Sequence, residues 1–337
     1  MLLKQPAARE KKPEFAALPP TIFRQLEKLC GGKIVSSDVA FGGLSASAGF
    51  VMTLDSGRNI FAKGTHPAET AHGAANLAQE IAAYETLAVL RTVSPPYLGI
   101  VSDGEQDGWM LGVWDFVAHD PGLASAQRVT SGLRQCHAAQ EGEGVLIPAR
   151  THGYIGFFFN NEKKWLRLRH DANIRKKFLA MFEDVTAAGK WCDKSIPVLC
   201  DYQARIGKIR GREGLLHGDL RLDNFLFSGE RNYIVDWPNA SYGPLVFDLC
   251  FLLSNLEAMG MGKTDELMTD FDWVDWDDVI AMLAALSGYF ADQAYRDVPD
   301  RMPRLRWMQQ SMLLAQLKTL ARLGIIESPP KMQGENQ

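Results

Sequence analysis

The spacing of the apolar positions changes about one third of the way along the chain. Before residue 117, apolar and polar residues alternate in short runs, which is typical of β-strands. The segment 76–90 differs, because its apolar residues recur every three to four positions and predict one long amphipathic helix. A shorter helix is predicted over residues 21–29. The predicted strands cover residues 34–42, 47–54, 58–63, 97–102 and 109–117.

After residue 117 the pattern becomes mainly helical. The stretch 215–236 interrupts it with two short strands, 225–227 and 233–235, which a turn containing Gly229 joins as a hairpin. The predicted helices cover residues 123–139, 173–189, 196–208, 246–259, 276–291 and 303–323.

These patterns predict an α+β fold with a small β-rich lobe, which contains the one long helix, and a larger mainly helical lobe. We expect the first lobe to span residues 21–116 and the second to span residues 117–326. Residues 1–20, which mix charges with prolines, are predicted to be a mobile tail. A second tail is predicted over residues 327–337.

Composition narrows the class of protein. Hydrophobic residues make up 46% of the 337 and charged residues 23%, which excludes a disordered chain. With 36 Lys and Arg against 40 Asp and Glu, the net charge is −4, so a nucleic-acid partner is not expected. Apolar runs fall far short of the ~18 residues that cross a bilayer, and no pattern indicates a protein partner. Five scattered cysteines without a Cys-x-x-Cys pair favour a reducing cytoplasm.

The residues that most clearly indicate a catalytic or metal-binding role lie in the stretch 215–236. It contains His217-Gly-Asp-Leu-Arg-Leu-Asp-Asn224, followed after the hairpin by Val235-Asp-Trp237. A hairpin there brings Asn224 and Asp236 to one end, where a carboxylate and an amide oxygen form a site suited to Mg²⁺. Asp219 is expected nearby on a loop, in position to accept a proton.

This combination resembles the catalytic core of the aminoglycoside phosphotransferase family, which includes choline, homoserine and fructosamine kinases and shares the protein-kinase fold. The resemblance covers roughly residues 35–325. It implies a bilobal fold and a small-molecule kinase that transfers the γ-phosphoryl group of MgATP, or alternatively GTP, to a substrate hydroxyl. Asp219 is then the catalytic base, and Asn224 and Asp236 hold Mg²⁺ on the nucleotide phosphates. Asp248 matches the downstream Asp that braces the catalytic loop, although a helix cap is an equally good interpretation.

Three further residues surround the proposed base. Arg221, two positions after Asp219, is a candidate to stabilise charge on the transferring phosphoryl group; the alternative is a solvated or Asp-paired side chain. Asp223 is expected to face solvent or to pair with Arg221. His217 is expected to form structural hydrogen bonds rather than to take part in catalysis.

The first lobe offers candidate nucleotide contacts. Gly43, Ser45 and Ser47 lie in a small, flexible connection between two strands, where backbone amides can cradle phosphates. By the resemblance, Lys63 contacts the nucleotide phosphates and Glu80 on the long helix is its ion-pair partner. Glu85 is the competing partner.

The resemblance also places a hinge at the end of the strand 109–117. Backbone groups of Asp115, Phe116 and Val117 are expected to meet the adenine edge. Trp114 is interpreted either as a wall of the base pocket or as a core residue, and both interpretations stay open.

The acceptor side is less determined. Residues 265–278 hold seven acids among aromatic residues, which indicates either a pocket for a cationic acceptor or the capping turn of the next helix; we favour the cap. Residues 153–159 with Trp165 form a second aromatic segment, as suited to the core as to an acceptor cleft.

Two other functions compete with a small-molecule kinase. A protein kinase is disfavoured because only eleven residues separate Asp236 from Asp248, which leaves no room for a long activation segment. The remaining alternative is a nucleotide-binding regulatory protein without turnover.

Overall fold

The computed structural model describes residues 1–65, 71–104, 108–140 and 163–336. By their contacts, the residues fall into two compact units. The sheet unit comprises Arg9–Pro148 and Asp223–Ala240, and the helical unit comprises Met1–Ala8, Ala149–Leu222 and Ser241–Gln337. The division into lobes after residue 116 stays a prediction, because the contacts group the later hairpin with the sheet.

The sheet unit is built on one antiparallel sheet of five strands in the order β1-β2-β3-β5-β4. The five predicted strands are therefore confirmed, with ends that differ by a few residues. They are β1 (Ile34–Val39), β2 (Ala48–Leu54), β3 (Asn59–Thr65), β4 (Tyr97–Ser102) and β5 (Met110–Asp115).

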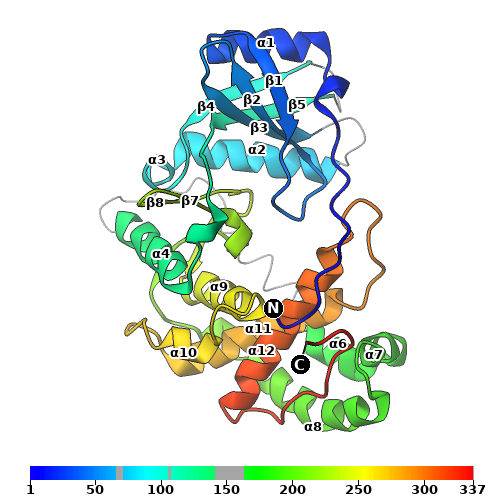
Figure 1. Cartoon of the computed structure of the whole chain (residues 1–337). Helices are drawn as coiled ribbons and strands as arrows, with labels where there is room; N and C mark the ends of the chain where they lie inside the picture. Colours follow the sequence, from blue (N-terminus) through cyan, green and yellow to red (C-terminus); the bar gives the residue numbers. More distant parts are fainter. Residues whose placement is uncertain (66–70, 105–107, 141–162, 337) are drawn as a thin grey trace. The chain divides into compact units, whose positions relative to one another are not determined.

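Alternation along the strands gives the sheet two different faces. Phe50 and Ala62, which pair across β2 and β3, are fully buried in a cluster with Leu26 of α1 (Pro20–Cys30). The next residue, Lys63, points to the opposite face and reaches Glu80 on α2 (Ala71–Thr86). Figure 1 shows α1 and α2 on opposite sides of the sheet. This alternation, with a period of two residues, thus separates an apolar face from a face that carries charge.

The rest of the sheet unit lies around a hairpin of β7 (Phe225–Ser228) and β8 (Arg231–Ile234). The helix α4 (Ala126–Gln140) packs beside it, and Arg128 Nε donates to Asn232 Oδ1 at 2.7 Å. Trp237, just after the hairpin, donates from Nε1 to Ser94 Oγ at 3.0 Å. The short elements are η1 (Phe15–Ala17), α3 (Leu90–Val93), η2 (Pro121–Leu123) and η4 (Leu222–Asn224).

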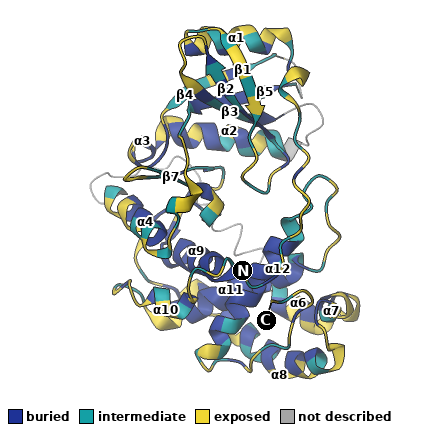
Figure 2. Cartoon of the chain, in the orientation of Figure 1, coloured by how far each residue is buried: buried dark blue, intermediate teal, exposed yellow. Residues whose placement is uncertain are grey.

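The helical unit is organised around α9 (Val246–Ala258), α11 (Trp276–Gln293) and α12 (Leu305–Arg322). Every residue of α9 is buried, and Figure 2 shows α9 and α11 coloured as buried along most of their length. Around them lie α6 (Lys164–His170), α7 (Ala172–Leu179), α8 (Val185–Gln203), α10 (Thr264–Met268), η3 (Ile206–Lys208), β6 (Glu213–Leu216) and β9 (Ser241–Pro244).

Two helix predictions in this unit are wrong at their boundaries. The predicted helix 173–189 is broken, because Asp184 caps α8 by accepting from the backbone N–H groups of Thr186 and Ala187, at 2.9 Å each. The predicted helix 196–208 is the second half of α8, and Pro197 lies inside that helix rather than at a start. A side-chain cap therefore decides the boundary that apolar spacing missed.

The terminal segments, which we expected to be tails, make specific contacts. Leu3 is 2% exposed, pairs with Glu335, and accepts from Trp307 Nε1 at 3.2 Å. Phe15 lies against Phe23 of α1, with ring centroids 4.8 Å apart. These residues are packed parts of the fold.

Among the described residues, no helix is long and apolar enough to cross a membrane.

Candidate functional site

Lys63 of β3 lies at the centre of a charged cluster in the sheet unit. Its Nζ is 2.8 Å from Glu80 Oε2 and 2.5 Å from Asp236 Oδ1. Glu80 is only 3% exposed, whereas Glu85 is exposed one turn further along α2. The expected ion pair between Lys63 and Glu80 is confirmed, and the structure adds Asp236 as a second partner.

The cluster keeps the lysine charged. Burial opposes the charge on Lys63, but the carboxylates of Asp236 and Glu80 outweigh it and raise the pKa of Lys63. Burial also raises the pKa of Glu80, and the neighbouring ammonium of Lys63 counteracts that effect. A fixed ammonium group beside two carboxylates is the result.

The β7–β8 hairpin brings the two predicted metal-binding residues to the same end. Val235 N donates to the carbonyl oxygen of Asn224 at 2.9 Å, so Asp236 follows directly beyond Asn224. Asn224 is 2% exposed. Asp236 has φ of +72°, the left-handed region that non-glycine residues rarely adopt. Strain of this kind persists only where the surroundings fix the residue, and it concentrates at functional sites.

The donor set at this end of the hairpin fits a hard cation. It offers one carboxylate and one amide oxygen, and Asp236 already accepts from the ammonium of Lys63. Among the described residues, no group of three or more His, Cys, Asp or Glu side chains is gathered to hold a metal ion. A hard cation bound by few protein oxygens usually completes its coordination with water and phosphate oxygens.

The second half of the motif lies in the helical unit, on the loop after β6. Asp248, in the first turn of α9, accepts from His217 N at 2.5 Å through Oδ2 and from Gly218 N at 3.0 Å through Oδ1. Gly218 has φ of +80°, which glycine adopts without a steric penalty. Of the two interpretations of Asp248, the structure supports the brace of the loop.

Burial has a large effect on Asp248. It raises the pKa of this carboxyl to about 7, although the two backbone N–H groups act in the opposite direction and the charge of Asp219 adds to the rise. The brace is therefore a buried carboxyl group whose charge depends on pH near neutrality.

Arg221 contacts the proposed base directly. Its Nη1 lies 2.7 Å from Oδ1 and 2.6 Å from Oδ2 of Asp219. The Arg221 side chain is 8% exposed and that of Asp219 is 29% exposed, so the arginine is the inner partner. Of the alternatives for Arg221, the Asp-paired one is observed, with Asp219 as the partner.

His217 is buried and accepts from Asp219 N through Nδ1 at 3.3 Å, which is the structural role expected of it.

Sequence reasoning missed Asn255. This residue is 2% exposed on α9, and its Oδ1 accepts from Leu222 N at 2.9 Å, two residues before Asn224. Asp248 and Asn255 thus fix the two ends of the loop that carries Asp219. A polar residue at a buried position of an otherwise apolar helix was the available signal.

The glycine-rich connection between β1 and β2 belongs to the sheet unit. Ser45 Oγ donates to Ser47 Oγ at 2.8 Å and accepts from Ser47 N at 3.1 Å, which forms a tight polar turn. A Cβ atom at Gly43 would lie 4.0 Å from Asp223 Oδ2. The connection therefore approaches the residue that precedes Asn224.

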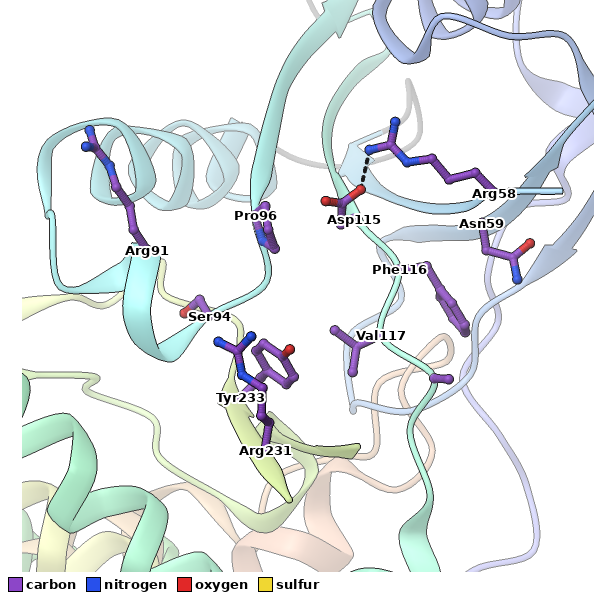
Figure 3. Close-up of a pocket in the computed structure, with 11 residues that line it drawn as sticks. Arg58, Asn59, Arg91, Ser94, Pro96, Asp115, Phe116, Val117, Arg231 and Tyr233 are labelled. Atoms are coloured by element: carbon purple, nitrogen blue, oxygen red, sulfur yellow. Dashed lines mark hydrogen bonds and ion pairs between the residues drawn. The ribbon is translucent and has the colours of Figure 1, made fainter. Parts of the chain in front are cut away.

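The predicted hinge residues line a cavity of about 590 Å³ in the sheet unit. Figure 3 shows Asp115, Phe116 and Val117 at the end of β5, with Tyr233 of β8 across from them and Arg58 paired with Asp115. In the part of the chain that the structure describes, neither the Lys63 cluster nor the glycine-rich connection lines this cavity. This cavity therefore contains one of the two groups of predicted nucleotide contacts.

Two aromatic side chains belong to the core. Trp114 is 4% exposed and packs on Tyr84 and Tyr97, with ring centroids 5.4 and 5.5 Å away. Trp165 is fully buried and donates from Nε1 to the carbonyl oxygen of Ala284 at 2.9 Å. The segment 153–159, named with Trp165 as a candidate acceptor lining, lies outside the described residues.

The acidic segment 265–278 has structural partners. Asp275 caps α11 by accepting from Asp277 N at 2.7 Å, and Asp265 pairs with Arg322 at 2.6 Å. The helix-cap interpretation is confirmed.

Comparisons with known proteins give one family and a set of related folds. The model of the phosphotransferase enzyme family matches residues 42–298. No curated protein matches the sequence. Among solved structures, a thermostable mutant of the aminoglycoside phosphotransferase APH(4)-Ia has a TM-score of 0.56 at 12% identity, over 90% of this chain and 99% of that chain.

Two further solved structures have the same fold. An amicoumacin kinase in complex with AMP-PNP and Ca²⁺ has a TM-score of 0.51 at 14% identity, over 88% of this chain and 93% of that chain. A choline/ethanolamine kinase family protein from Mesorhizobium loti has a TM-score of 0.50 at 15% identity, over 85% and 88%. The expected protein-kinase-like fold is confirmed, while identities this low carry no information on the acceptor.

Proposed function

Because this chain belongs to the phosphotransferase enzyme family, we propose that it is a small-molecule kinase that transfers the γ-phosphoryl group of MgATP to a substrate hydroxyl. The observation that carries the proposal is the cluster in which Lys63 contacts both Glu80 and Asp236, with Asn224 at the same end of the hairpin. A cation for phosphate and two oxygen donors for a metal are what nucleotide phosphates require.

In this proposal the sheet unit binds the nucleotide. Lys63 contacts the phosphates, and Glu80 keeps it in position. Gly43, Ser45 and Ser47 offer backbone and hydroxyl groups to the phosphate oxygens. Backbone groups of Asp115, Phe116 and Val117 are proposed to meet the base, with ATP as the expected donor and GTP as the alternative.

Asn224 and Asp236 are proposed to hold Mg²⁺. The metal, when bound, supplies positive charge that neutralises the phosphate oxygens. Asp236 would hold the cation through its carboxylate, which already accepts from Lys63, and its left-handed backbone sets the direction of that carboxylate. Asn224, buried at the start of β7, presents a neutral oxygen that needs no counter-charge.

Asp219 is proposed to accept the proton of the acceptor hydroxyl. The hydroxyl O–H bond breaks toward the carboxylate, the oxygen forms a bond to the γ-phosphorus, and the bond from that phosphorus to the β-phosphate oxygen breaks. Arg221 contacts both oxygens of Asp219 and so orients the base, which makes it a positioning residue. Positioning and charge neutralisation together account for most of the catalysis of phosphoryl transfer.

A second candidate is a nucleotide-binding regulatory protein without turnover. The contact of Arg221 with both oxygens of Asp219 favours it, because the guanidinium takes up part of the carboxylate's capacity to accept a substrate proton. The two candidates differ in whether any acceptor is phosphorylated.

The first test measures nucleotide binding. The midpoint of thermal unfolding is followed with ATP or GTP, each with and without Mg²⁺, for the wild type, Asp236→Ala and the exposed control Asp38→Ala. A ligand that binds only the folded protein raises this midpoint by mass action. We expect a Mg²⁺-dependent rise in the wild type and in Asp38→Ala, and none in Asp236→Ala. Absence of any rise in the wild type contradicts the proposal.

The second test concerns turnover. In an acceptor screen with radiolabelled ATP, Asp219→Ala is expected to lower the rate by roughly 10²–10⁴ while the nucleotide-dependent rise in midpoint remains. An unchanged rate in Asp219→Ala would sink the assignment of the base. Tight Mg²⁺-nucleotide binding without any product would favour the regulatory candidate instead.

A further inference from the structure

Residues 9–15, before the first helix, are anchored to the sheet unit at both ends. The Arg9 guanidinium lies 5.9 Å from the ring centroid of Phe41, in the β1–β2 connection. At the other end, the ring of Phe15 lies 5.2 Å from that of Phe50 on β2. Glu10 is only 3% exposed. Figure 1 shows this dark blue segment running beside the β1–β2 connection.

These anchors place Lys12 at the start of β2. Its Nζ lies 3.5 Å from the position that a Cβ atom on Gly49 would take, and the carbonyl oxygen of Ala40 is equally close to that position. Ala40 and Gly49 are themselves joined by a backbone hydrogen bond of 2.8 Å. The ammonium group of Lys12 therefore lies where the glycine-rich connection returns to the sheet.

The register of the sheet shows which face Lys12 occupies. Gly49 pairs directly with Lys63 across β2 and β3. Directly opposed residues of an antiparallel pair project from the same face, with Cβ atoms about 5 Å apart. The neighbouring pair, Phe50 with Ala62, projects to the other face, into the core against α1. Lys12 thus lies on the face of the sheet that carries Lys63.

The charges on this face leave a role for a second cation. Lys63 shares its single positive charge with two carboxylates, those of Glu80 and Asp236, so the three groups together are negative. A nucleoside triphosphate that binds to this face adds several more negative charges. A lysine ammonium is a compact charge on a flexible stem, which can reach phosphate oxygens without a fixed geometry.

We infer that Lys12 is a second phosphate-binding cation of the proposed nucleotide site, supplied by the segment 9–15 that runs beside the glycine-rich connection. The inference rests on the proposed function and assigns a residue far outside the motifs. Lys12 contacts the nucleotide phosphates from the β2 side of this face, and Lys63 contacts them from the β3 side.

The test compares affinities for MgATP and for adenosine, measured by isothermal titration calorimetry on the full chain. The variants are Lys12→Met, Lys12→Arg and Lys11→Met; the last makes the same charge change at the exposed neighbouring residue. We expect Lys12→Met to weaken MgATP binding about tenfold, since a hydrogen bond to a charged group contributes this much or more. Lys12→Arg should stay within about threefold of wild type, because the charge is kept. Lys11→Met should leave both affinities unchanged, and no variant should alter adenosine binding.

Each other outcome overturns the inference in a recognisable way. Equal MgATP affinity in the wild type and Lys12→Met overturns it and leaves the proposed function standing. Tighter binding in Lys12→Met makes Lys12 a competitor of the nucleotide and also overturns it. No MgATP binding in the wild type overturns both the inference and the proposed function. Thermal unfolding of each variant establishes that it is folded, and Lys12→Arg supplies the comparison if Lys12→Met is not.

Discussion

Replacing Asp248 by alanine tests how the loop that carries Asp219 is held. Asp248 accepts from the backbone N–H groups of His217 and Gly218, and its side chain is buried. In Asp248→Ala both donors lose their acceptor. A buried donor left without a partner costs about 1–3 kcal/mol. The first N–H group is buried and the second is partly buried, so the second is assigned the lower end of that range.

Two effects set the net magnitude. The unpaired donors together destabilise the folded protein by about 2–4 kcal/mol. Removal of the buried carboxyl group offsets part of this loss of stability, because burial disfavours the charged form of the carboxyl. We therefore expect the free energy of unfolding to fall by about 2–3 kcal/mol in Asp248→Ala. Asp248→Asn keeps one carbonyl oxygen as acceptor and should lose about half as much.

Urea unfolding at pH 8, followed by tryptophan fluorescence, measures these differences. The matched control is Asp270→Ala, because Asp270 is exposed in the same unit; its effect should stay within about 0.5 kcal/mol. The expected order of stability is wild type, Asp248→Asn, Asp248→Ala. If Asp248→Ala unfolds within 0.5 kcal/mol of wild type, the brace is not a stabilising interaction and the reasoning fails. The same variants should lower turnover without changing nucleotide affinity, since the proposed nucleotide contacts lie in the sheet unit.

Two further predictions concern pH and backbone strain. The folded state raises the pKa of Asp248 from 3.8 to about 7, so it keeps a proton that the unfolded chain releases. The stability that this group contributes is complete below pH 4 and is lost as pH rises to about 7. The free energy of unfolding should therefore fall more across this window in the wild type than in Asp248→Asn. Equal dependence of the unfolding free energy on pH in the two proteins, measured by urea titration, would contradict this. The free energy of unfolding of Asp236→Gly should be about 1 kcal/mol higher than that of Asp236→Ala, because only glycine adopts a φ of +72° without strain. Both variants lack the carboxylate, so equal stability would show that the backbone there is not strained.

Much of the fold was predictable because it depends on neighbours in the sequence. The strands β2, β3 and β5 and the β7–β8 hairpin follow from alternation and turn residues, which act within a few positions. The spacing from His217 to Asp236 was enough to identify the family. The pairing of Lys63 with Glu80 was predictable from the resemblance to the family, in which a strand lysine pairs with a glutamate of the following helix.

Helix boundaries were less predictable where caps compete with apolar spacing. The break before α8 depends on Asp184, whose side chain bonds to two backbone N–H groups. The predicted helix 196–208 belongs mostly to the second half of α8, with Pro197 inside that helix. Apolar periodicity continues through both positions, so the spacing by itself does not distinguish a break from a continuous helix.

The sequence by itself determined the class of fold, the hairpin with Asn224 and Asp236, and the loop with Asp219. Only the tertiary structure decided that Asp236 pairs with Lys63, that Asn255 holds Leu222, and that Lys12 lies on the face of Lys63. The physical reason is the distance along the chain over which each interaction acts. Periodicity and turns arise between residues a few positions apart, whereas a buried polar or charged group takes whichever partner the packed chain brings to it from dozens of positions away.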